Sequence, residues 1–385
     1  MARILVVTNT DFFMRLFLEP LVGELDRRGH AVELCCNGEA LGPALSGYPH
    51  HPFDFPSRPA PMDFLRAGLR MRRLLQRGRF DLVNSHNRNA SIVARSAAAG
   101  TGIHSVYTAN GYYFNDAQGP GAYAASVALE TALGGVTSLT LSQTEEDANL
   151  MRRWRLAPRD RIRVIGNGVD LERFRPAEGR LRAKRERELG LPSGRFRFIA
   201  VGRLVEGKGF QDLLEAFARL AGRHMSIELL QVGGNIAQDI SPFQAAYQER
   251  IQALGLGDRV LMTGMTAQVP AYLSVSDVYV TPSYWEGLSR SLLEGMAMGL
   301  PVLATQIRGA REVVRHGQNG YLYPPHDVRS LTELMERMVM ASMNERLALG
   351  QAARSDIVRS FELKDYTDRQ ADAIDAVLEG LVSRN

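Results

Sequence analysis

Two successive series of strand-like and helix-like segments constrain the fold of this chain more than any other feature. The first series places apolar strand patterns at 3–8, 31–36, 82–85, 105–108 and 138–141, and helical patterns at 16–28, 64–77, 90–99 and 122–133. Strands that alternate with helices favour a parallel sheet covered by helices on both faces. A loop rich in proline, 43–61, separates the second strand from the following helix.

The second series repeats the pattern with strands at 196–201, 226–232, 260–263, 278–281 and 301–305, and helices at 210–222, 241–254, 269–274 and 288–298. Between the series, 165–170 and 174–176 are rich in turn residues and predict an interdomain linker. We therefore expect an α/β protein of two doubly wound, Rossmann-like domains that face each other across a cleft. The predicted domains are 1–165, joined by 363–385, and 176–362.

Length and composition agree with two soluble domains. The 385 residues exceed what one hydrophobic core usually organises. No apolar run reaches the roughly 20 residues needed to span a bilayer, and the chain opens on a strand-like run instead of a signal peptide. These features predict a cytoplasmic protein. Cys35 and Cys36 are adjacent in a strand and support neither a disulfide framework nor a zinc site.

The net charge is only +4, but arginine is concentrated at 152–155, 159–163 and 180–187. These clusters have three interpretations: solvated helix faces, attraction to an anionic membrane, and nucleic-acid binding. No zinc-finger, basic-zipper or RNA-recognition signature accompanies them, so we expect no nucleic-acid partner.

A glycine-bounded loop with two cations follows the first strand of the second series. It runs from Gly202 to Gly209 and contains Arg203 and Lys208. Glycines let the backbone approach a ligand, and two cations at a helix start can bind a diphosphate. The chain has only three lysines among 46 basic residues, and one of them is at this turn. The alternative is an exposed turn with two solvated charges.

A second loop, 281–288, carries Glu286 and leads into a helix that carries Glu294. Free backbone N–H groups near Gly287 could bind phosphate at the predicted helix start. Either glutamate alone is explained as well by the helix dipole or by solvation. The turn at 233–235 is weak evidence by itself, because glycine pairs mostly mark plain turns.

The combination resembles the nucleotide-sugar domain of glycosyltransferase family 4, which has the GT-B fold. The features that carry the resemblance are the loop with Arg203 and Lys208, and Glu286 followed after seven residues by Glu294 and then by 299–302, Gly-Leu-Pro-Val. The segments 167–170 and 317–321 add to it. The similarity covers most of the second half of the chain.

This resemblance implies roles for individual residues. Arg203 and Lys208 would neutralise the donor diphosphate, Glu286 would contact hydroxyls of the transferred sugar, and Glu294 would contact the ribose. Backbone N–H groups of Gly287, Leu288 and Ser289 would bind phosphate or sugar. The donor would also lie along Gly234 and Thr266. The catalytic set is Glu286, Arg203, Lys208 and, in the first domain, Asn110.

The resemblance also implies retention of anomeric configuration without a metal or other cofactor. The sequence agrees in one respect, because it has no Asp-x-Asp triplet and no histidine pair with ligand spacing beyond His50-His51. The first domain would hold the acceptor, the second the donor, and the final helix, 365–381, would cross back to the first domain.

The first half departs from the family pattern in two places. The turn after the first strand, 8–13, contains no glycine and presents Phe12 and Phe13, which suit either an apolar acceptor or the core. Asn110 stands where many members have a histidine, and it can hydrogen-bond a hydroxyl but carry no proton. His86 follows another strand and is a candidate to compensate; the alternative is a polar surface residue.

We therefore expect a retaining hexosyltransferase that moves a hexose or N-acetylhexosamine from a nucleotide-diphosphate sugar, UDP favoured over GDP, to a saccharide or lipid-linked acceptor. Bacterial polysaccharide or envelope glycan synthesis is the expected setting, with peripheral contact at the inner face of the membrane. The alternatives are a UDP-sugar epimerase on the same fold, an oxidoreductase, and a non-catalytic nucleotide-binding protein. Neither half has the Gly-x-Gly-x-x-Gly signature of a Rossmann oxidoreductase.

Overall fold

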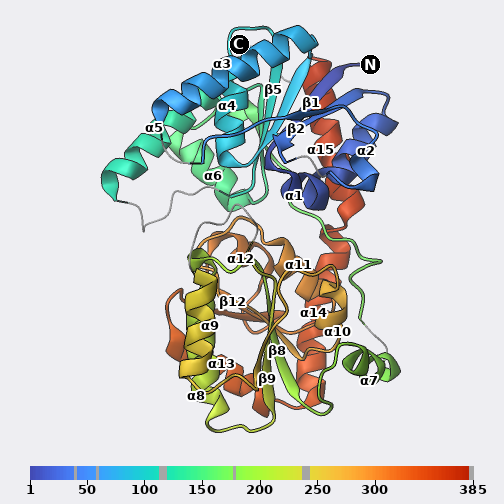
Figure 1. Ribbon diagram of the computed structural model, residues 1–385, viewed down its shortest axis with the longest axis vertical. Coiled ribbons are helices and arrows are strands. Elements are labelled where there is room, and N and C mark those ends of the chain that lie inside the picture. Colours follow the sequence, from blue (N-terminus) through green and yellow to red (C-terminus); the bar gives the residue numbers. More distant parts are fainter. Residues whose placement is uncertain (39–40, 58–59, 112–118, 177–178, 236–242, 381–385) are drawn as a thin grey trace. The chain divides into compact units, whose positions relative to one another are not determined.

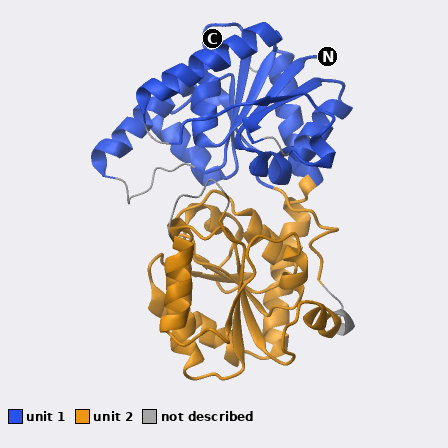
Figure 2. Ribbon diagram, in the orientation of Figure 1, with its two compact units in different colours: residues 1–167, 364–385 blue, residues 168–363 orange. Residues whose placement is uncertain are grey.

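The computed structural model describes residues 1–38, 41–57, 60–111, 119–176, 179–235 and 243–380. These residues form two compact units, 1–167 with 364–385 and 168–363 (Figure 2). The elements are labelled in Figure 1. Each unit contains one parallel sheet.

The first unit is built on a sheet in the order β3-β2-β1-β4-β5-β6-β7, all of whose neighbouring strands are parallel within the described residues. Its strands are β1 (Arg3–Thr10), β2 (Ala31–Asn37), β3 (His50–Pro52), β4 (Leu82–His86), β5 (His104–Ala109), β6 (Leu139–Ser142) and β7 (Ile162–Val164). Chain order reverses between β1 and β4, which makes this pair the switch point of the sheet.

Helices accompany this sheet: α1 (Asp11–Phe13), α2 (Glu19–Arg27), α3 (Pro61–Gly78), α4 (Arg88–Ala98), α5 (Pro120–Val136), α6 (Glu145–Trp154) and α15 (Leu363–Leu378). Leu5, Val7 and Val83 of the sheet share a buried core with α3 and α4. The C-terminal helix α15 belongs to this first unit, as the sequence predicts. Arg28 binds Asp375 of α15 at 2.7 Å, and Arg369 of α15 donates to the Ile165 carbonyl at 2.8 Å.

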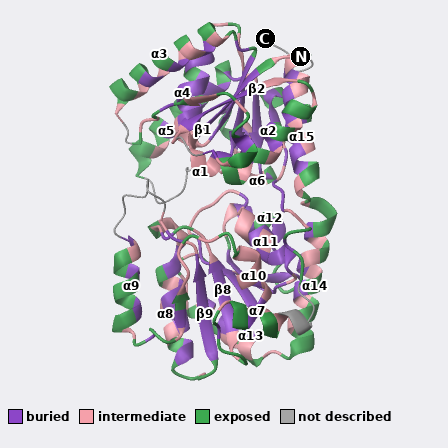
Figure 3. Ribbon diagram, turned by 45° about the vertical axis from the view of Figure 1, so that its right-hand side comes forward, coloured by how far each residue is buried: buried purple, intermediate pink, exposed green. Residues whose placement is uncertain are grey.

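The second unit repeats the design with the order β10-β9-β8-β11-β12-β13, again parallel within the described part of the chain. Its strands are β8 (Phe196–Val201), β9 (Ile227–Val232), β10 (Val260–Met262), β11 (Val278–Thr281), β12 (Val302–Thr305) and β13 (Gly320–Tyr323). The switch point lies between β8 and β11. The strands of both units are largely buried, purple in Figure 3.

The helices of the second unit are α7 (Gly179–Glu188), α8 (Phe210–Ala221), α9 (Phe243–Ala253), α10 (Val269–Ser274), α11 (Arg290–Ala297), α12 (Arg308–Val313), α13 (Val328–Met340) and α14 (Met343–Ser360). Phe198, Ala200 and Val280 form a core with α8, α9 and α13. Ile199 and Tyr279 point to the other core, with α10, α11 and α14. Successive strand residues thus fill two apolar layers, as expected of a doubly wound sheet.

The structure departs from the sequence-based elements in several places. The single helix predicted at 16–28 is interrupted: Met14–Leu18 is a π-helical segment, and α2 begins at Glu19 with a proline in its first turn. Pro20 cannot donate a backbone hydrogen bond, so a helix readily starts there. Leu16, the first residue of the predicted helix, lies in the π-helical segment and is exposed. The strands β3, β7 and β13 and the helices α12, α13 and α14 were not predicted.

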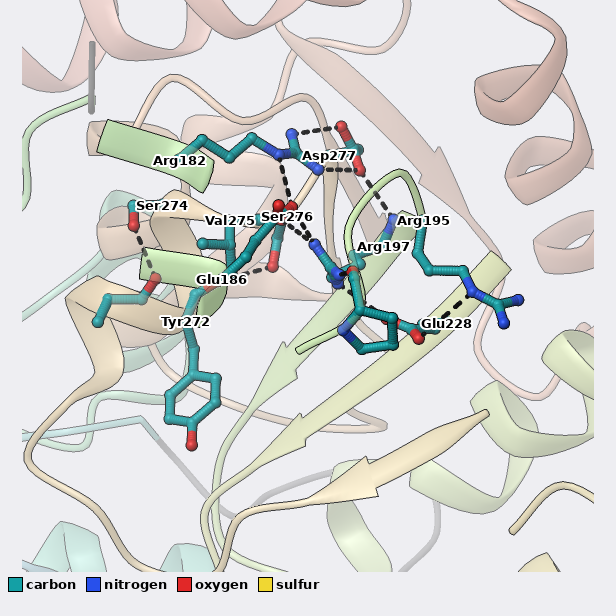
Figure 4. Close-up of polar contacts among 12 residues, drawn as sticks. Arg182, Glu186, Arg195, Arg197, Glu228, Tyr272, Ser274, Val275, Ser276 and Asp277 are labelled. Atoms are coloured by element: carbon teal, nitrogen blue, oxygen red, sulfur yellow. Dashed lines mark hydrogen bonds and ion pairs between the residues drawn. The ribbon is translucent and has the colours of Figure 1, made fainter. Parts of the chain in front are cut away.

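A buried charge network joins the amino-terminal ends of three strands to α7 (Figure 4). The fully buried guanidinium of Arg197 donates to Glu228 at 2.8 Å and to Glu186 of α7 at 2.6 Å. Asp277 accepts two bonds from Arg182, at 2.8 and 3.0 Å, and one from the Arg197 backbone at 2.8 Å. Burial raises the pKa of Glu186, but the bonds from Arg197 and Arg182 outweigh it and hold that pKa below its ordinary value.

Replacing Arg197 by Met should destabilise the protein by about 3 kcal/mol, because it leaves two buried carboxylates without their central cation. The measurement is urea-induced unfolding followed by circular dichroism. Arg195→Met is the matched control: the side chain of Arg195 is partly exposed, at 36%, and lies 3.8 Å from Glu228, so its loss should cost less than about 1 kcal/mol. Equal effects of the two substitutions would contradict a stabilising role for the network.

Candidate active site

The candidate residues of the second unit gather at the carboxyl ends of β8 and β11. These strands are direct neighbours, with Val278 beside Phe198 and Tyr279 beside Ile199. The loop after β8 is 202–209, and the loop after β11 is 282–289. Parallel strands bring the loops that follow them to one edge of the sheet, and the switch point is where such sheets bind ligands. Both loops therefore lie at the same edge of the sheet, at its switch point.

Close backbone packing holds the two loops together. The backbone N–H of Tyr284 donates to the Gly207 carbonyl at 2.9 Å. Gly209 has φ +65°, and a Cβ there would lie 2.0 Å from the carbonyl oxygen of Pro282. Glycine meets both demands, since it tolerates positive φ and has no Cβ. The loop after β8 ends at this residue, and α8 begins at Phe210.

Lys208 and Glu286 face each other across this contact. The ammonium of Lys208 forms an ion pair with one carboxylate oxygen of Glu286. The second oxygen of Glu286 is buried and has no hydrogen-bond partner among the described residues. Both side chains are about one-fifth exposed, at 20% and 19%. A half-buried cation and an under-satisfied carboxylate therefore lie side by side at the switch point.

The segment Gly287–Ser289 precedes α11 and does not belong to it. The helix begins at Arg290, two residues later than predicted, so Glu286 lies in the loop and not at the first helical turn. The side chain of Ser289, the N-cap residue, makes no capping hydrogen bond. The N–H groups at the start of a helix lack partners within it, and the helix dipole favours an anion there.

Glycine at 309 lets a further segment lie against this loop. A Cβ at Gly309, in the first turn of α12, would lie 1.7 Å from the Gly287 carbonyl oxygen. Thr305, at the end of β12, donates its hydroxyl to the Ser283 carbonyl at 2.5 Å. The loop after β12 thus supports the loop after β11. Sequence reasoning missed both residues, although a glycine shortly after a strand was a usable signal for Gly309.

Glu294 lies on α11 beside cations. Its carboxylate is 4.0 Å from the Arg290 guanidinium, and its side chain is 16% exposed. Burial raises the pKa of Glu294 to about 7, against the opposing effect of Arg290 and Arg173. Glu294 lies off the buried stripe of the helix, which includes Leu292, Leu293 and Met296. Its charge changes near neutral pH.

The loops after β9 and β10 meet beside the same edge. Gly233 donates its N–H to the Gly264 carbonyl at 3.1 Å, and Gly234 is buried against Gly264. The hydroxyl of Thr266 accepts the backbone N–H of Gln268 at 3.0 Å. β8 connects to this pair, since Gly202 donates to the Val232 carbonyl at 2.9 Å. Arg203 is exposed in the loop after β8.

The first unit carries a polar group at its own switch point. The hydroxyl of Thr8, on β1, hydrogen-bonds the side chain of Asn87, which follows β4 and has φ +62°. The side-chain oxygen of Asn9 accepts the N–H of Ala90 at 2.8 Å and so caps the start of α4. The polar end of β1 and the polar loop after β4 therefore meet here.

His86 is not the loop histidine that the sequence suggested. It is the last residue of β4, only 1% exposed, and its ring lies 6.3 Å from that of Phe13. Burial lowers the pKa of His86 to about 3, so the imidazole is neutral near neutral pH. Phe13 stacks on Phe17 with ring centroids 4.7 Å apart, and both rings are half-buried.

Asn110 follows β5 and is half-buried. Its side-chain nitrogen has no hydrogen-bond partner among the described residues. The aromatic segment that follows in the sequence, 112–114, lies outside the described residues. Of the predicted catalytic set, Asn110 belongs to the first unit, whereas Glu286, Arg203 and Lys208 belong to the second.

No three His, Cys, Asp or Glu side chains in the described ranges are grouped as metal ligands would be. In the same ranges, none of the helices combines the length and the apolar character required to cross a bilayer.

Taken together, two doubly wound parallel sheets with ligand-competent loops at the switch point define a GT-B protein. The family model described as Glycosyltransferase Family 4 matches residues 17–173, and that described as glycosyl transferases group 1 matches residues 182–356. The chain belongs to glycosyltransferase family 4 and is a glycosyltransferase.

Individual relatives agree with this assignment. The chain is 28% identical to the UDP-Gal:α-D-GlcNAc-diphosphoundecaprenol α-1,3-galactosyltransferase of Escherichia coli, over 78% of this chain and 76% of that enzyme. It is 25% identical to a D-inositol 3-phosphate glycosyltransferase of Arthrobacter, over 84% and 81% of the two chains.

Solved structures share the fold over nearly the full length. The sucrose-phosphate synthase of Thermosynechococcus elongatus superposes with a TM-score of 0.84 at 19% identity, covering 99% of this chain and 100% of that one. HepE of Anabaena, solved in complex with UDP and glucose, gives a TM-score of 0.81 at 18% identity, covering 98% and 100%. These similarities confirm the predicted fold class.

Gly309→Ala tests the close packing of the loop after β11. We expect it to cost about 1–3 kcal/mol of stability, because the new methyl group displaces the Gly287 backbone. Gly23→Ala is the control, since a Cβ at Gly23 of α2 meets nothing within 4 Å and alanine favours a helix by about 0.5–1 kcal/mol. Thermal unfolding measures both. A Gly309→Ala protein as stable as the wild type would show that this contact is dispensable.

Proposed function

We propose that this glycosyltransferase transfers a hexose or N-acetylhexosamine from a nucleotide-diphosphate sugar, with retention of configuration and without a metal. The acceptor is a hydroxyl of a saccharide or of a lipid-linked saccharide, in bacterial polysaccharide or envelope glycan synthesis. The observation that carries the proposal is the meeting of Lys208 and Glu286 at the switch point, next to the Gly287–Ser289 backbone.

In this proposal Lys208 and Arg203 bind the donor diphosphate. Lys208 is half-buried beside the start of α8, where a compact cation and free backbone N–H groups favour phosphate. Arg203 is exposed in the same loop and has the reach of a long side chain. Backbone N–H groups of Gly287, Leu288 and Ser289, ahead of α11, add donors to phosphate or sugar. Two cations then supply the positive charge that a metal supplies in other enzymes.

Glu286 is assigned to the transferred sugar. Without a donor, one of its oxygens pairs with Lys208 and the other is buried and unpartnered among the described residues. Burial of a carboxylate oxygen without a hydrogen-bond donor costs free energy, and hydroxyls of the sugar would supply the missing hydrogen bonds. A diphosphate would compete with Glu286 for Lys208, so donor binding would free the carboxylate for the sugar.

The nucleoside is assigned to the other loops. Glu294 would accept the ribose hydroxyls, and Gly234 and Thr266 would lie along the base, at the contact between the loops after β9 and β10. A UDP-sugar is favoured over a GDP-sugar. HepE was solved with UDP, and the relative from Escherichia coli is named for UDP-galactose, which supports this choice.

The chemical step follows from the charges on the donor. As the bond between the anomeric carbon and the diphosphate breaks, negative charge develops on the leaving phosphate, and Lys208 and Arg203 stabilise it. The acceptor hydroxyl attacks the same face, and the departing phosphate oxygen takes its proton. This front-face route retains the anomeric configuration, as the family resemblance implies, and needs no separate protein base.

The acceptor is assigned to the first unit. Asn110, whose amide nitrogen has no partner among the described residues, and the polar groups at Thr8 and Asn87 can hydrogen-bond hydroxyls. The name of the Escherichia coli relative includes a diphosphoundecaprenol-linked sugar, which supports a lipid-linked acceptor and a protein that works at the inner face of the membrane.

The function is tested by a thermal-shift screen of nucleotide diphosphates, followed by incubation of the best UDP-sugar with and without a lipid-linked acceptor. We expect stabilisation by UDP, since ligand binding raises apparent stability, and transfer only with acceptor present. Addition of EDTA should leave the rate unchanged. Formation of an epimer without acceptor would instead identify an epimerase, and binding with no turnover would leave a nucleotide-binding protein.

Lys208 and Glu286 should respond differently to substitution. Lys208→Ala should weaken UDP binding by about tenfold or more, because a charge-assisted contact with phosphate is lost. Glu286→Gln should lower kcat strongly yet leave UDP binding unchanged or tighter, because the ion pair no longer competes with the diphosphate. Calorimetry gives the affinities and product formation gives kcat. Unchanged UDP affinity in Lys208→Ala would refute the diphosphate contact.

Donor affinity should depend on pH through Glu294. Its raised pKa, about 7, means that a proton competes with the ribose hydroxyls for the carboxylate as pH falls. Between pH 8 and pH 6 the affinity for a UDP-sugar should fall about tenfold, as linkage to one group of this pKa requires. Glu294→Gln should bind more weakly at pH 8 and should lose most of this dependence. A pH dependence that survives this substitution would assign it elsewhere.

A further inference from the structure

The exposed face of α3 carries apolar side chains that the fold does not use. Met62, Leu65 and Leu69 are 58%, 55% and 50% exposed. Their spacing of three and four residues places them on one face of the helix. The opposite face, through Ala67, Met71 and Leu75, fills the core against α4. In Figure 3 exposed and buried stretches of the ribbon alternate along α3, as expected of a helix with one buried face.

Four arginines form a second exposed stripe beside the apolar one. They are spaced four, three and four residues apart and are all exposed: Arg66, Arg70, Arg73 and Arg77. The guanidinium of Arg70 also lies 5.0 Å from the centre of the Phe53 ring and donates to the Asp54 carbonyl at 3.2 Å. Arg66 is four residues from Met62, and Arg73 is four from Leu69, so the stripes adjoin. Asp63, 3.8 Å from Arg66, is the acid on this face. Within the described residues Arg73 and Arg77 have no acidic partner.

This combination fits an anionic bilayer better than another protein surface. Apolar side chains next to exposed arginines, two of which have no acidic partner among the described residues, allow a helix to lie in the interface. The apolar side chains would lie among the acyl chains and the arginines at anionic headgroups. A second copy of this chain would present the same four arginines, and these would repel across a two-fold interface.

The position of α3 in the first unit suits such contact. β3 is parallel to β2 and leads to α3, so the first turns of α3 lie toward the carboxyl edge of the sheet. Asn89, at the start of α4, donates to the Pro56 carbonyl at 2.8 Å and ties the loop before α3 to that edge. The apolar residues occupy this first half of the helix. The edge is the one that carries Thr8 and Asn87.

We propose that the exposed face of α3, formed by Met62, Leu65, Leu69 and the arginines 66, 70, 73 and 77, docks on an anionic phospholipid surface. The proposal deepens the membrane contact suggested under the proposed function by naming the surface. It holds or fails independently of the transferase chemistry, because the contact requires neither donor nor acceptor.

Co-sedimentation of the full-length protein with vesicles tests this docking. The vesicles contain either phosphatidylcholine alone or about one-third phosphatidylglycerol, at low and at high salt. We expect binding to the anionic vesicles only, with loss of binding at about 0.5 M salt, where charges are screened. No binding of the wild type to anionic vesicles at low salt would overturn the proposal.

Paired variants locate the surface. Leu65→Gln/Leu69→Gln and Arg66→Gln/Arg73→Gln should each lower the partition coefficient at least tenfold, since each arginine at an anionic surface contributes about fivefold. The controls are Leu347→Gln/Val358→Gln on α14, at positions 48% and 47% exposed, and Arg187→Gln/Arg329→Gln, which removes the same charge from exposed sites. All four double variants replace exposed residues, and circular dichroism checks that each variant is folded.

Two results would overturn the assignment to α3. The first is vesicle binding by the α3 variants equal to that of their controls. The second is a wild-type dimer, seen by light scattering, that Leu65→Gln/Leu69→Gln converts to a monomer with unchanged vesicle binding, because the face would then bind a second copy. UDP binding is measured on the same samples, so failure of the proposed function would be recognised separately.

Discussion

Backbone-to-backbone contact between loops is the constraint on which the candidate site depends. The parallel sheet brings the loops after β8, β11 and β12 to one edge, but ordinary side chains would hold their backbones apart. Gly209 against Pro282 and Gly309 against Gly287 remove that obstacle. Lys208 and Glu286 meet because the loops that carry them are in direct contact. The site therefore depends on two glycines, because only a residue without a side chain allows these backbones to touch.

The two edges of the second sheet serve different purposes. At the amino-terminal ends of the strands, buried ion pairs around Arg197 are fully formed and fix α7 to the sheet. At the carboxyl ends, the polar groups are only partly satisfied, with one oxygen of Glu286 unpartnered among the described residues. Glu294, with a pKa near 7, adds a charge that is weakly held there. The amino-terminal edge of the sheet, where the charges are paired, thus supports a carboxyl edge where polar groups remain available to a ligand.

Much of this architecture could be predicted from the sequence, and the failures have physical causes. β8 was predicted with its observed bounds because the apolar run 198–201 marks a strand buried on both faces, although Arg197 interrupts the pattern near its start. β3 and β7 are three residues long, too short for periodicity to detect. α14 buries little besides Gly350, Ala353 and Ile357, so its apolar stripe is faint. Lys208 and Glu286 were found through order and spacing, whereas Gly309 acts through packing that a sequence does not display.

The C-terminal helix α15 also bears on how the chain acquires its structure. The first unit contains residues from both ends of the chain, and Ala371, Ile374 and Val377 of α15 are buried in it. During synthesis the strands β1 to β7 emerge first, yet the helix that completes their unit emerges last. The second unit, 168–363, is continuous and can close while the first still exposes the apolar surface that α15 will cover. The first unit is therefore synthesised first but completes its fold last, and it needs protection from aggregation for the longest time.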